Sequence, residues 1–318
     1  MFPFRVCADG VFLVTFCPQK LTFFRSQSFS IKGDNCGFCE SFVEASPVRK
    51  ILFGFEPLRN RKILKQIDNT RFAAEFRSFD SPLDWEKFDA IIPLTLPDQW
   101  HLQRVCPDLN GTRFLTPNWP LVELAHDKPR FNRFLCDQGL DAYVPYMGNW
   151  QRYPFVLKKN RDAGAEHTHL IESIVDEQRW AAELASSDYF CQEYVPGQVE
   201  YTTHLLFDGG VRYQMSVRFD SNQPWYIRGV ATQASRGIRM SRVSLPCENV
   251  FSRILDLIGY RGTCCFNYKL IGGRPMIFEM NPRIGGSLPL DLNNYLDTVL
   301  SVLGRTESHA EFPGSRQF

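Results

Sequence analysis

Two glycine pairs, each set between two strand-like segments, constrain the fold of this chain most. Gly209-Gly210 and Gly272-Gly273 each interrupt a stretch rich in apolar and aromatic residues. A short glycine turn between two such stretches predicts a β-hairpin, because glycine adopts the backbone angles of a tight turn without strain. The predicted hairpins join 200–207 to 211–219 and 264–271 to 275–280. From residue 150 onward we therefore expect an α+β fold with mostly antiparallel strands.

The first half of the chain has a different rhythm, in which strand-like and helix-like segments alternate. The segments are a buried strand at 50–55, a helix at 57–67, strands at 71–79 and 88–94, and a helix at 97–106. This alternation is typical of a small α/β domain with a parallel sheet. No G-x-G-x-x-G follows the first strand, so the usual dinucleotide-binding fold is not supported.

Charge and hydropathy exclude several classes of protein. Across 318 residues the formal net charge is +1, which gives no reason to expect a nucleic-acid binder or a polybasic membrane anchor. The apolar run Val11–Val14 is far shorter than the roughly 18–20 residues of a membrane span. The N-terminus has no small-residue cleavage site of a secretory signal, so we expect a cytoplasmic protein.

Four of the ten cysteines lie in the first 40 residues. Cys36 and Cys39 have zinc-knuckle spacing, but no second C-x-x-C and no H-x₃-H partner accompanies them. We therefore interpret the cysteines as free thiols of a reducing compartment. Cys264-Cys265 and His204 are interpreted as structural residues of strands.

The residues that carry chemistry end the second hairpin. Glu279, Asn281 and Arg283 are two residues apart, which on a strand places their side chains on one face. A carboxylate, an amide oxygen and a guanidinium on one face suit a Mg²⁺-bound polyphosphate. A solvated strand face is the alternative, but Pro282 and Gly285-Gly286 favour a ligand, because they end the strand and expose bare backbone.

Three further features point to the same ligand. Lys158 ends a strand and precedes the small-residue loop Asp162–Ala165, which can present an ammonium group and backbone N–H groups to phosphates. Lys128 lies near the start of a helix predicted for 126–139, with Gly139 as its C-cap. The segment Gln192–Glu200 places two carboxylates around a strand that turns at Pro196-Gly197.

These pieces, in this order, resemble the ATP-grasp superfamily, which includes biotin carboxylase, D-alanine–D-alanine ligase and carbamoyl-phosphate synthase. The resemblance covers about 50–304 and implies a strand whose backbone reads adenine. It implies an adenine site formed by Gln192, Glu193, Tyr194 and Val195, with Phe278 as its lid, and contacts to the ribose from Glu200. It implies that Lys128 and Lys158 contact the phosphates. It also implies that Glu279 and Asn281 ligate Mg²⁺ and that Arg283 lies near the transferred phosphate. Mn²⁺ could replace Mg²⁺ at the same ligands.

Two positions depart from the family pattern. Asn267 stands where an acidic metal ligand is usual, twelve residues before Glu279. Its amide oxygen can ligate Mg²⁺, and carbamoyl-phosphate synthase is similar in using an amide, but the lost charge should weaken metal binding. The loop Asp162–Thr168 contains only one glycine, Gly164.

The resemblance implies a fold and a domain order. We expect an α/β pre-domain followed by an α+β ATP-grasp fold whose two subdomains clasp ATP. The expected boundaries are a leader at 1–49, the pre-domain at 50–125, the ATP-grasp domain at 126–304 with a smaller lid subdomain at about 150–195, and a polar tail at 305–318.

The resemblance also implies an activity. ATP would phosphorylate a substrate carboxylate, and an amine would displace phosphate from the acylphosphate. Arg228, Arg236 and Arg239 are candidates to receive the substrate carboxylate, and the amides of Gly286 and Ser287 could stabilise the oxyanion. The short sequence after Arg283 favours a stand-alone ligase. Small-molecule carboxylate and amine substrates are expected, their identity and a homodimer remain open, and no nucleic acid or membrane is expected.

Two other interpretations remain at this stage. The first is a catalytically weak ATP-binding protein of the same fold, regulatory or dependent on a partner, which Asn267 and the altered loop favour. The second is an unrelated α+β binding protein in which E-x-N-x-R occurs by chance.

Overall fold

The computed structural model describes residues 47–148, 152–162, 165–223, 226–228, 238–244 and 247–310. All of them belong to the compact unit Ser46–Phe318. The leader with its Cys36 and Cys39 pair, and Arg236, lie outside the described residues.

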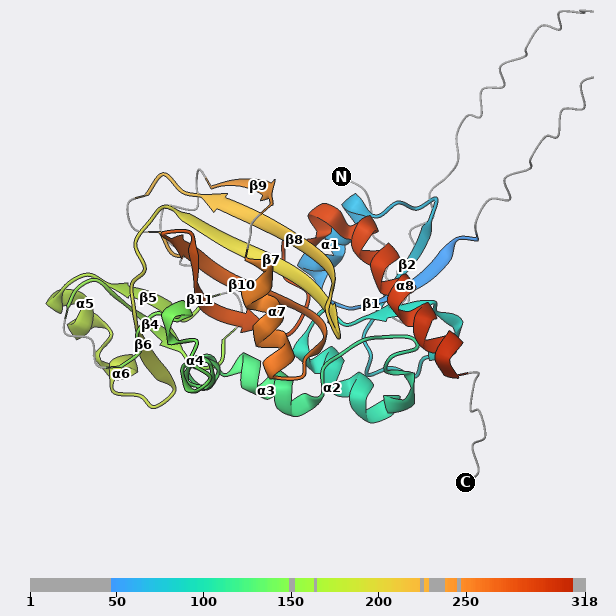
Figure 1. Cartoon of the computed structure of the whole chain (residues 1–318), viewed down its shortest axis with the longest axis horizontal. Coiled ribbons are helices and arrows are strands. Elements are labelled where there is room, and N and C mark those ends of the chain that lie inside the picture. The colour runs from blue at the N-terminus through green and yellow to red at the C-terminus, as the bar shows by residue number, and fades with distance from the viewer. Residues whose placement is uncertain are drawn as a thin grey trace, which may run out of the picture. The chain divides into compact units, whose positions relative to one another are not determined.

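The predicted parallel sheet is present in the first half of the described chain (Figure 1). Strand β1 (Arg49–Gly54) lies between β2 (Phe72–Arg77) and β3 (Ala90–Ile92) and pairs in parallel with both. Helices α1 (Pro57–Gln66) and α2 (Leu96–Val105) follow β1 and β3. The third strand is shorter than predicted, and β1 includes Arg49, which we had assigned to the leader.

Local capping chemistry fixes the start of α1. The carboxylate of Glu56 accepts hydrogen bonds from the amides of Leu58 and Arg59 at 3.2 and 2.7 Å, and Pro57 occupies the first helical position. On the strand side, Ile51, Leu52 and Phe53 are fully buried. The capping contacts and the buried strand therefore fix the position of the N-terminal end of α1, which lies near the candidate site described below.

Both predicted hairpins are confirmed within one antiparallel five-stranded sheet. Its strands, in spatial order, are β11 (Arg274–Asn281), β10 (Arg261–Ile271), β7 (Val199–Asp208), β8 (Val211–Asp220) and β9 (Arg239–Val243). Gly209-Gly210 and Gly272-Gly273 all have positive φ, as the turns require. One face of the sheet packs on α7 (Glu248–Leu257) and the other on α8 (Leu292–Ala310).

A separate three-stranded antiparallel sheet occupies the region expected for the lid. Strand β4 (Phe155–Lys159) lies between β5 (Thr168–Ile171) and β6 (Tyr189–Glu193). The short helices α5 (Ile174–Arg179) and α6 (Ala181–Leu184), which we did not predict, are grouped with it in Figure 1. Short 3₁₀ helices lie at Trp85–Lys87, Pro107–Leu109, Asp141–Tyr143 and Leu288–Asp291.

Two predicted helix boundaries were wrong. The helix expected at 126–139 is α4 (Lys128–Asp137), preceded by a separate helix, α3 (Trp119–His126). Asp127 divides them because its carboxylate accepts from the amide of Arg130 at 3.1 Å as the N-cap of α4. Gly139 follows α4 with φ +69°, which agrees with its predicted capping role. Helix α8 continues to Ala310, into the predicted tail.

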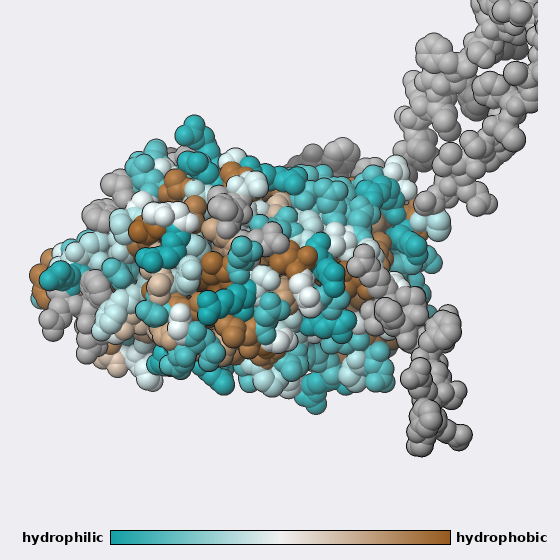
Figure 2. Space-filling model, viewed as in Figure 1, coloured by the Kyte–Doolittle hydropathy of each residue, from teal (hydrophilic) through white to brown (hydrophobic). Residues whose placement is uncertain are grey.

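None of the helices in the described residues is long and apolar enough to cross a membrane. On the face shown in Figure 2, polar residues cover most of the described surface and apolar residues are scattered in small groups.

Candidate functional site

The β10–β11 hairpin brings Asn267 directly opposite Glu279. Asn267 Nδ2 donates to Glu279 Oε1 at 2.6 Å, and Asn281 Nδ2 donates to the same oxygen at 3.0 Å. Arg283 Nη2 donates to Asn281 Oδ1 at 3.3 Å. Glu279, Asn281 and Arg283 therefore form one chain of contacts. Glu279 and Asn281 share a face of β11 as predicted, whereas Arg283 lies two residues past the end of the strand and reaches Asn281 from the turn.

Two buried lysines from other elements reach this cluster. Lys128, the first residue of α4, places Nζ 3.7 Å from Glu279 Oε2 and donates to Asp162 O at 3.1 Å. Lys158 of β4 donates to Gln192 Oε1 at 2.7 Å and lies 5.1 Å from the ring centroid of Phe278. Both lysines are less than 10% exposed. Residues more than 100 positions apart in sequence thus meet around one carboxylate.

Burial and charge shift the pKa values of these groups in opposite senses. Burial alone would raise the pKa of Glu279, but Lys128, Lys158 and the two asparagine amides outweigh it and lower the pKa to about 2. Burial lowers the pKa of Lys158 to about 8, although Glu279 opposes this shift. One carboxylate thus faces two ammonium groups, an arrangement that favours a further anion.

The strand predicted to read adenine is β6 with the residues that follow it. Gln192 is 1% exposed, and its Nε2 has no hydrogen-bond partner within the described ranges. Glu193 belongs to the opposite face, since its carboxylate accepts from the amide of Tyr146 at 3.4 Å. Of Glu193, therefore, only the backbone can face the predicted adenine site, which lies on the same face of β6 as the Gln192 side chain.

Lys269 is a residue of the site that the sequence analysis missed. It is 2% exposed, and its Nζ donates to the carbonyls of Val195 and Tyr226, both at 2.8 Å. Burial lowers its pKa to about 8. A lysine in the middle of a buried strand, two residues after Asn267 and so on the same face, is the signal that could have identified it.

Arg228 is tied to the site rather than exposed for a substrate. Its Nε lies 3.4 Å from Glu200 Oε1, and its backbone amide donates to Glu200 Oε2 at 3.2 Å. Its guanidinium also donates to Thr202 Oγ1, and Nη2 donates to Asn267 Oδ1 at 2.6 Å. The buried Glu200 carboxylate is thus paired with Arg228.

These contacts fix the orientation of the Asn267 amide. Arginine has only donors, so the oxygen of Asn267 must face Arg228, and a carboxylate has only acceptors, so the nitrogen must face Glu279. Thr202 Oγ1 also donates to Asn267 Oδ1 at 2.7 Å. The oxygen predicted to ligate Mg²⁺ is therefore already engaged.

His204 supports the turn that follows β11. The ring is fully buried, and Nε2 lies 2.8 Å from Ser287 Oγ. Burial, together with Arg228 and Arg283, lowers its pKa to about 3, so the imidazole is neutral. A Cβ atom on Gly285 would lie 2.4 Å from its Cε1, which requires glycine there. This agrees with a structural role for His204.

No protein-family model and no curated protein matches the sequence. Solved structures do match it. D-alanine–D-alanine ligase from Bacillus anthracis, complexed with ATP, is similar with a TM-score of 0.56 at 14% identity, over 83% of this chain and 100% of that chain. An ATP-grasp ligase, PsnB, complexed with a minimal precursor, is similar with a TM-score of 0.52 at 12% identity, over 80% and 100%.

The chain has the ATP-grasp fold. Phosphoribosylamine–glycine ligase from Thermotoga maritima is also similar to this chain, with a TM-score of 0.57 at 14% identity over 80% of this chain and 75% of that chain. The predicted resemblance is therefore confirmed at the level of the fold. Lys128, Lys158, Gln192, Phe278, Glu279 and Asn281, to which the resemblance assigned nucleotide and metal roles, lie together in this ATP-grasp chain.

Proposed function

We propose that this ATP-grasp protein is an ATP- and Mg²⁺-dependent ligase that joins a carboxylate to an amine through an acylphosphate. The observation that carries the proposal is the meeting of Lys128 and Lys158 around Glu279 on this fold. Similar structures named as ligases support the reaction class, and the Bacillus anthracis enzyme is one that was solved with ATP.

The residues present fit an adenine nucleotide. Gln192 Nε2 is a buried donor without an acceptor in the described residues, which a bound base could supply. Lys128 and Lys158 would hold phosphates, the backbone of Glu193, Tyr194 and Val195 would hold the base, and Phe278 would cover it. Lys269 would fix the position of Val195 through its carbonyl.

The fit to a metal ion is narrower. Within the described residues, no group of three or more His, Cys, Asp or Glu side chains is arranged to hold a metal. Glu279 Oε2 and the oxygen of Asn281, after rotation of its amide, would hold Mg²⁺, because among the described residues Asn281 Oδ1 is engaged only by a 3.3 Å contact with Arg283. The oxygen of Asn267 would lose two short contacts, to Thr202 and Arg228, before it could take part.

The protein's own side chains would position the substrates and neutralise their charge, and none of them would form a covalent bond to a substrate. When bound, Mg²⁺ would offset the charge of the phosphates and withdraw electrons from the transferred one. A substrate carboxylate oxygen attacks the γ-phosphorus, ADP leaves, and an amine then attacks the acyl carbon and expels phosphate. Lys158 and Arg283 would offset the negative charge of the phosphates during phosphoryl transfer. The amides of Gly286 and Ser287 would stabilise the oxyanion that forms when the amine attacks.

The test separates nucleotide binding from turnover. With the full chain, ADP release is measured in Mg²⁺ over pooled amino acids and small acids, and ATP affinity is measured by calorimetry. Lys158→Met should weaken ATP binding at least tenfold, whereas Lys159→Met, whose side chain lies on the other face of β4, should not. Glu279→Gln should remove the Mg²⁺-dependent ADP release and keep ATP binding. Wild-type protein that does not bind ATP would refute the proposal.

A second candidate function is an ATP-binding protein with little catalysis. It is favoured by Arg228, which engages both Glu200 and Asn267. ATP binding without ADP release for any acid and amine would support this candidate over the ligase.

A further inference from the structure

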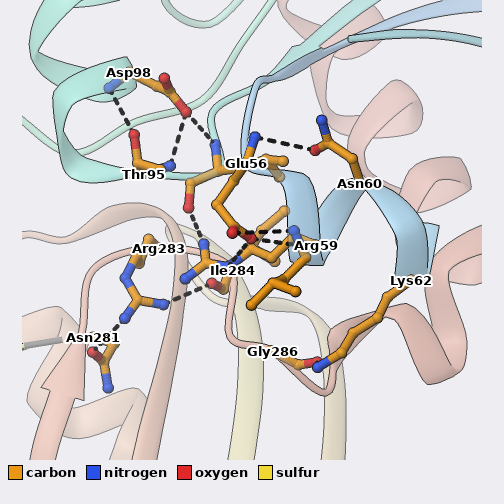
Figure 3. A network of polar contacts seen from close by, with 12 residues as sticks. Glu56, Arg59, Asn60, Lys62, Thr95, Asp98, Asn281, Arg283, Ile284 and Gly286 are labelled. Atoms are coloured by element: carbon orange, nitrogen blue, oxygen red, sulfur yellow. Dashed lines mark hydrogen bonds and ion pairs between the residues drawn. The ribbon is translucent and has the colours of Figure 1, made fainter. Parts of the chain in front are cut away.

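Helix α1 lies beside the turn Arg283–Ser287 that follows β11 (Figure 3). Lys62 Nζ donates to Gly286 O at 3.4 Å. Arg59, one turn before Lys62, lies next to Arg283 in the same view and donates to the carbonyl of Leu94. We name Arg59, Lys62 and Arg283 the cationic corner. The first two come from the parallel-sheet region, and the third comes from the turn that follows the strand carrying Glu279.

The cationic corner is only partly neutralised. Glu56 Oε2 lies 3.7 Å from Arg59 Nε. Within the part of the chain that the structure describes, Lys62 and Arg283 form no ion pair with a carboxylate and donate only to neutral oxygens. Glu56 is thus the one carboxylate of the described residues that forms an ion pair with these three cations, and the corner keeps an excess of positive charge.

The charges of Glu56 and Asp98 both act on Arg59, but these carboxylates also serve backbone amides. Both oxygens of Glu56 are already acceptors for amides at the start of α1, and Asp98 Oδ2 accepts from the amides of Leu94 and Thr95, both at 2.9 Å. Burial, and then the charge of Arg283, lower the pKa of Arg59 to about 10. Like charges held this close in a half-buried place are typical of a site that receives an anion.

The backbone of the same turn adds donors. Among the described residues, the amides of Gly285, Gly286 and Ser287 have no acceptor. Among the described residues, a Cβ atom on Gly286 would meet only Lys62 Nζ, at 3.8 Å, so these residues leave the space beside Gly286 open. His204 contacts the hydroxyl of Ser287 through Nε2, at 2.8 Å, and so supports the turn without using these amides.

We propose that the cationic corner binds the acyl substrate and that this substrate is a dicarboxylic acid. This rests on the proposed function, which it deepens by naming the substrate class. The reacting carboxylate lies at Arg283 and the amides of the turn, and the second carboxylate lies at Lys62 and Arg59. A monocarboxylic acid leaves one cation of the corner without a partner, so it binds less well.

The test measures binding, so that it does not depend on turnover. The full chain, with and without ATP and Mg²⁺, is titrated with two matched pairs, succinate with succinamate and glutamate with glutamine. In each pair an amide replaces one carboxylate with little change in size. We expect at least one diacid to bind at least tenfold more tightly than its monoamide. Equal affinity within both pairs, or no binding of any of the four probes, would overturn the inference.

The variant Lys62→Met tests whether the cationic corner causes the preference for diacids. Lys62 is exposed, so its substitution should leave the fold intact while it removes most of the preference for the diacid. The matched control is Arg61→Met, an exposed cation on the adjacent position of α1. Identical behaviour of the two variants would also overturn the inference. The proposed ligase function is judged separately by ATP affinity and ADP release, and it survives if only the preference for diacids is absent.

Discussion

Glu279→Gln tests the electrostatics of the site most directly. Glutamine keeps the shape of the side chain but removes the charge that faces Lys128 and Lys158. The folded-state pKa of Glu279 is about 2, against an ordinary value of 4.5. At about 1.4 kcal/mol per pKa unit, this difference corresponds to roughly 3 kcal/mol of stability in the wild-type protein at neutral pH.

The pH dependence has a defined sign. Because the pKa is lowered on folding, the stabilisation is fully present above pH 4.5 and is lost as the pH falls towards 2. Urea unfolding of wild type and variant at pH 7, 5, 4 and 3 measures the difference between their unfolding free energies. We expect roughly 3 kcal/mol at pH 7, shrinking steadily below pH 4.5.

The comparison cancels the other carboxylates, since they titrate in both proteins. Glu86→Gln, an exposed glutamate, is the matched control and should change stability by less than about 0.5 kcal/mol at every pH. A Glu279→Gln effect that is the same at pH 7 and pH 3, or that equals the control at pH 7, would refute the reasoning.

Three further predictions concern the neighbouring groups. Because burial lowers the pKa of Lys158 to about 8, bound phosphates should raise it, and ATP binding at pH 9 should take up a proton; calorimetry in two buffers of different ionisation enthalpy measures this, and identical heats would contradict it. Lys269→Met should lower the unfolding free energy by about 1–3 kcal/mol and weaken ATP binding, because two buried carbonyls lose their donor; unchanged urea unfolding would exclude that role. Gly285→Ala should lower the melting temperature by several degrees, whereas Gly286→Ala, whose added methyl meets only Lys62, should not, and equal thermal shifts would count against the role of His204.

Local chemistry explains what was correctly predicted from sequence. Strand alternation has a period of two, so Glu279 and Asn281 share a face wherever that strand lies. The Gly272-Gly273 turn sets the register of its hairpin as far as Tyr268 and Ile277, and a register shift between Asn267 and Tyr268 then places Asn267 opposite Glu279. The division of α3 and α4 at Asp127 was also encoded locally, by an N-cap residue followed by Lys-Pro, and was missed because the apolar pattern continues across it.

Contacts between distant segments were decided only by the tertiary structure. The sequence by itself determined the two hairpins, the parallel sheet and the shared face of Glu279 and Asn281, because these follow from turn residues, from the order of strands and helices, and from strand alternation. It could not determine that Arg228 engages Asn267, that Lys269 holds Val195, or that α1 brings Lys62 to Gly286. These pairs are separated by 39 to 224 positions, and only the packing of sheets and helices sets their distances.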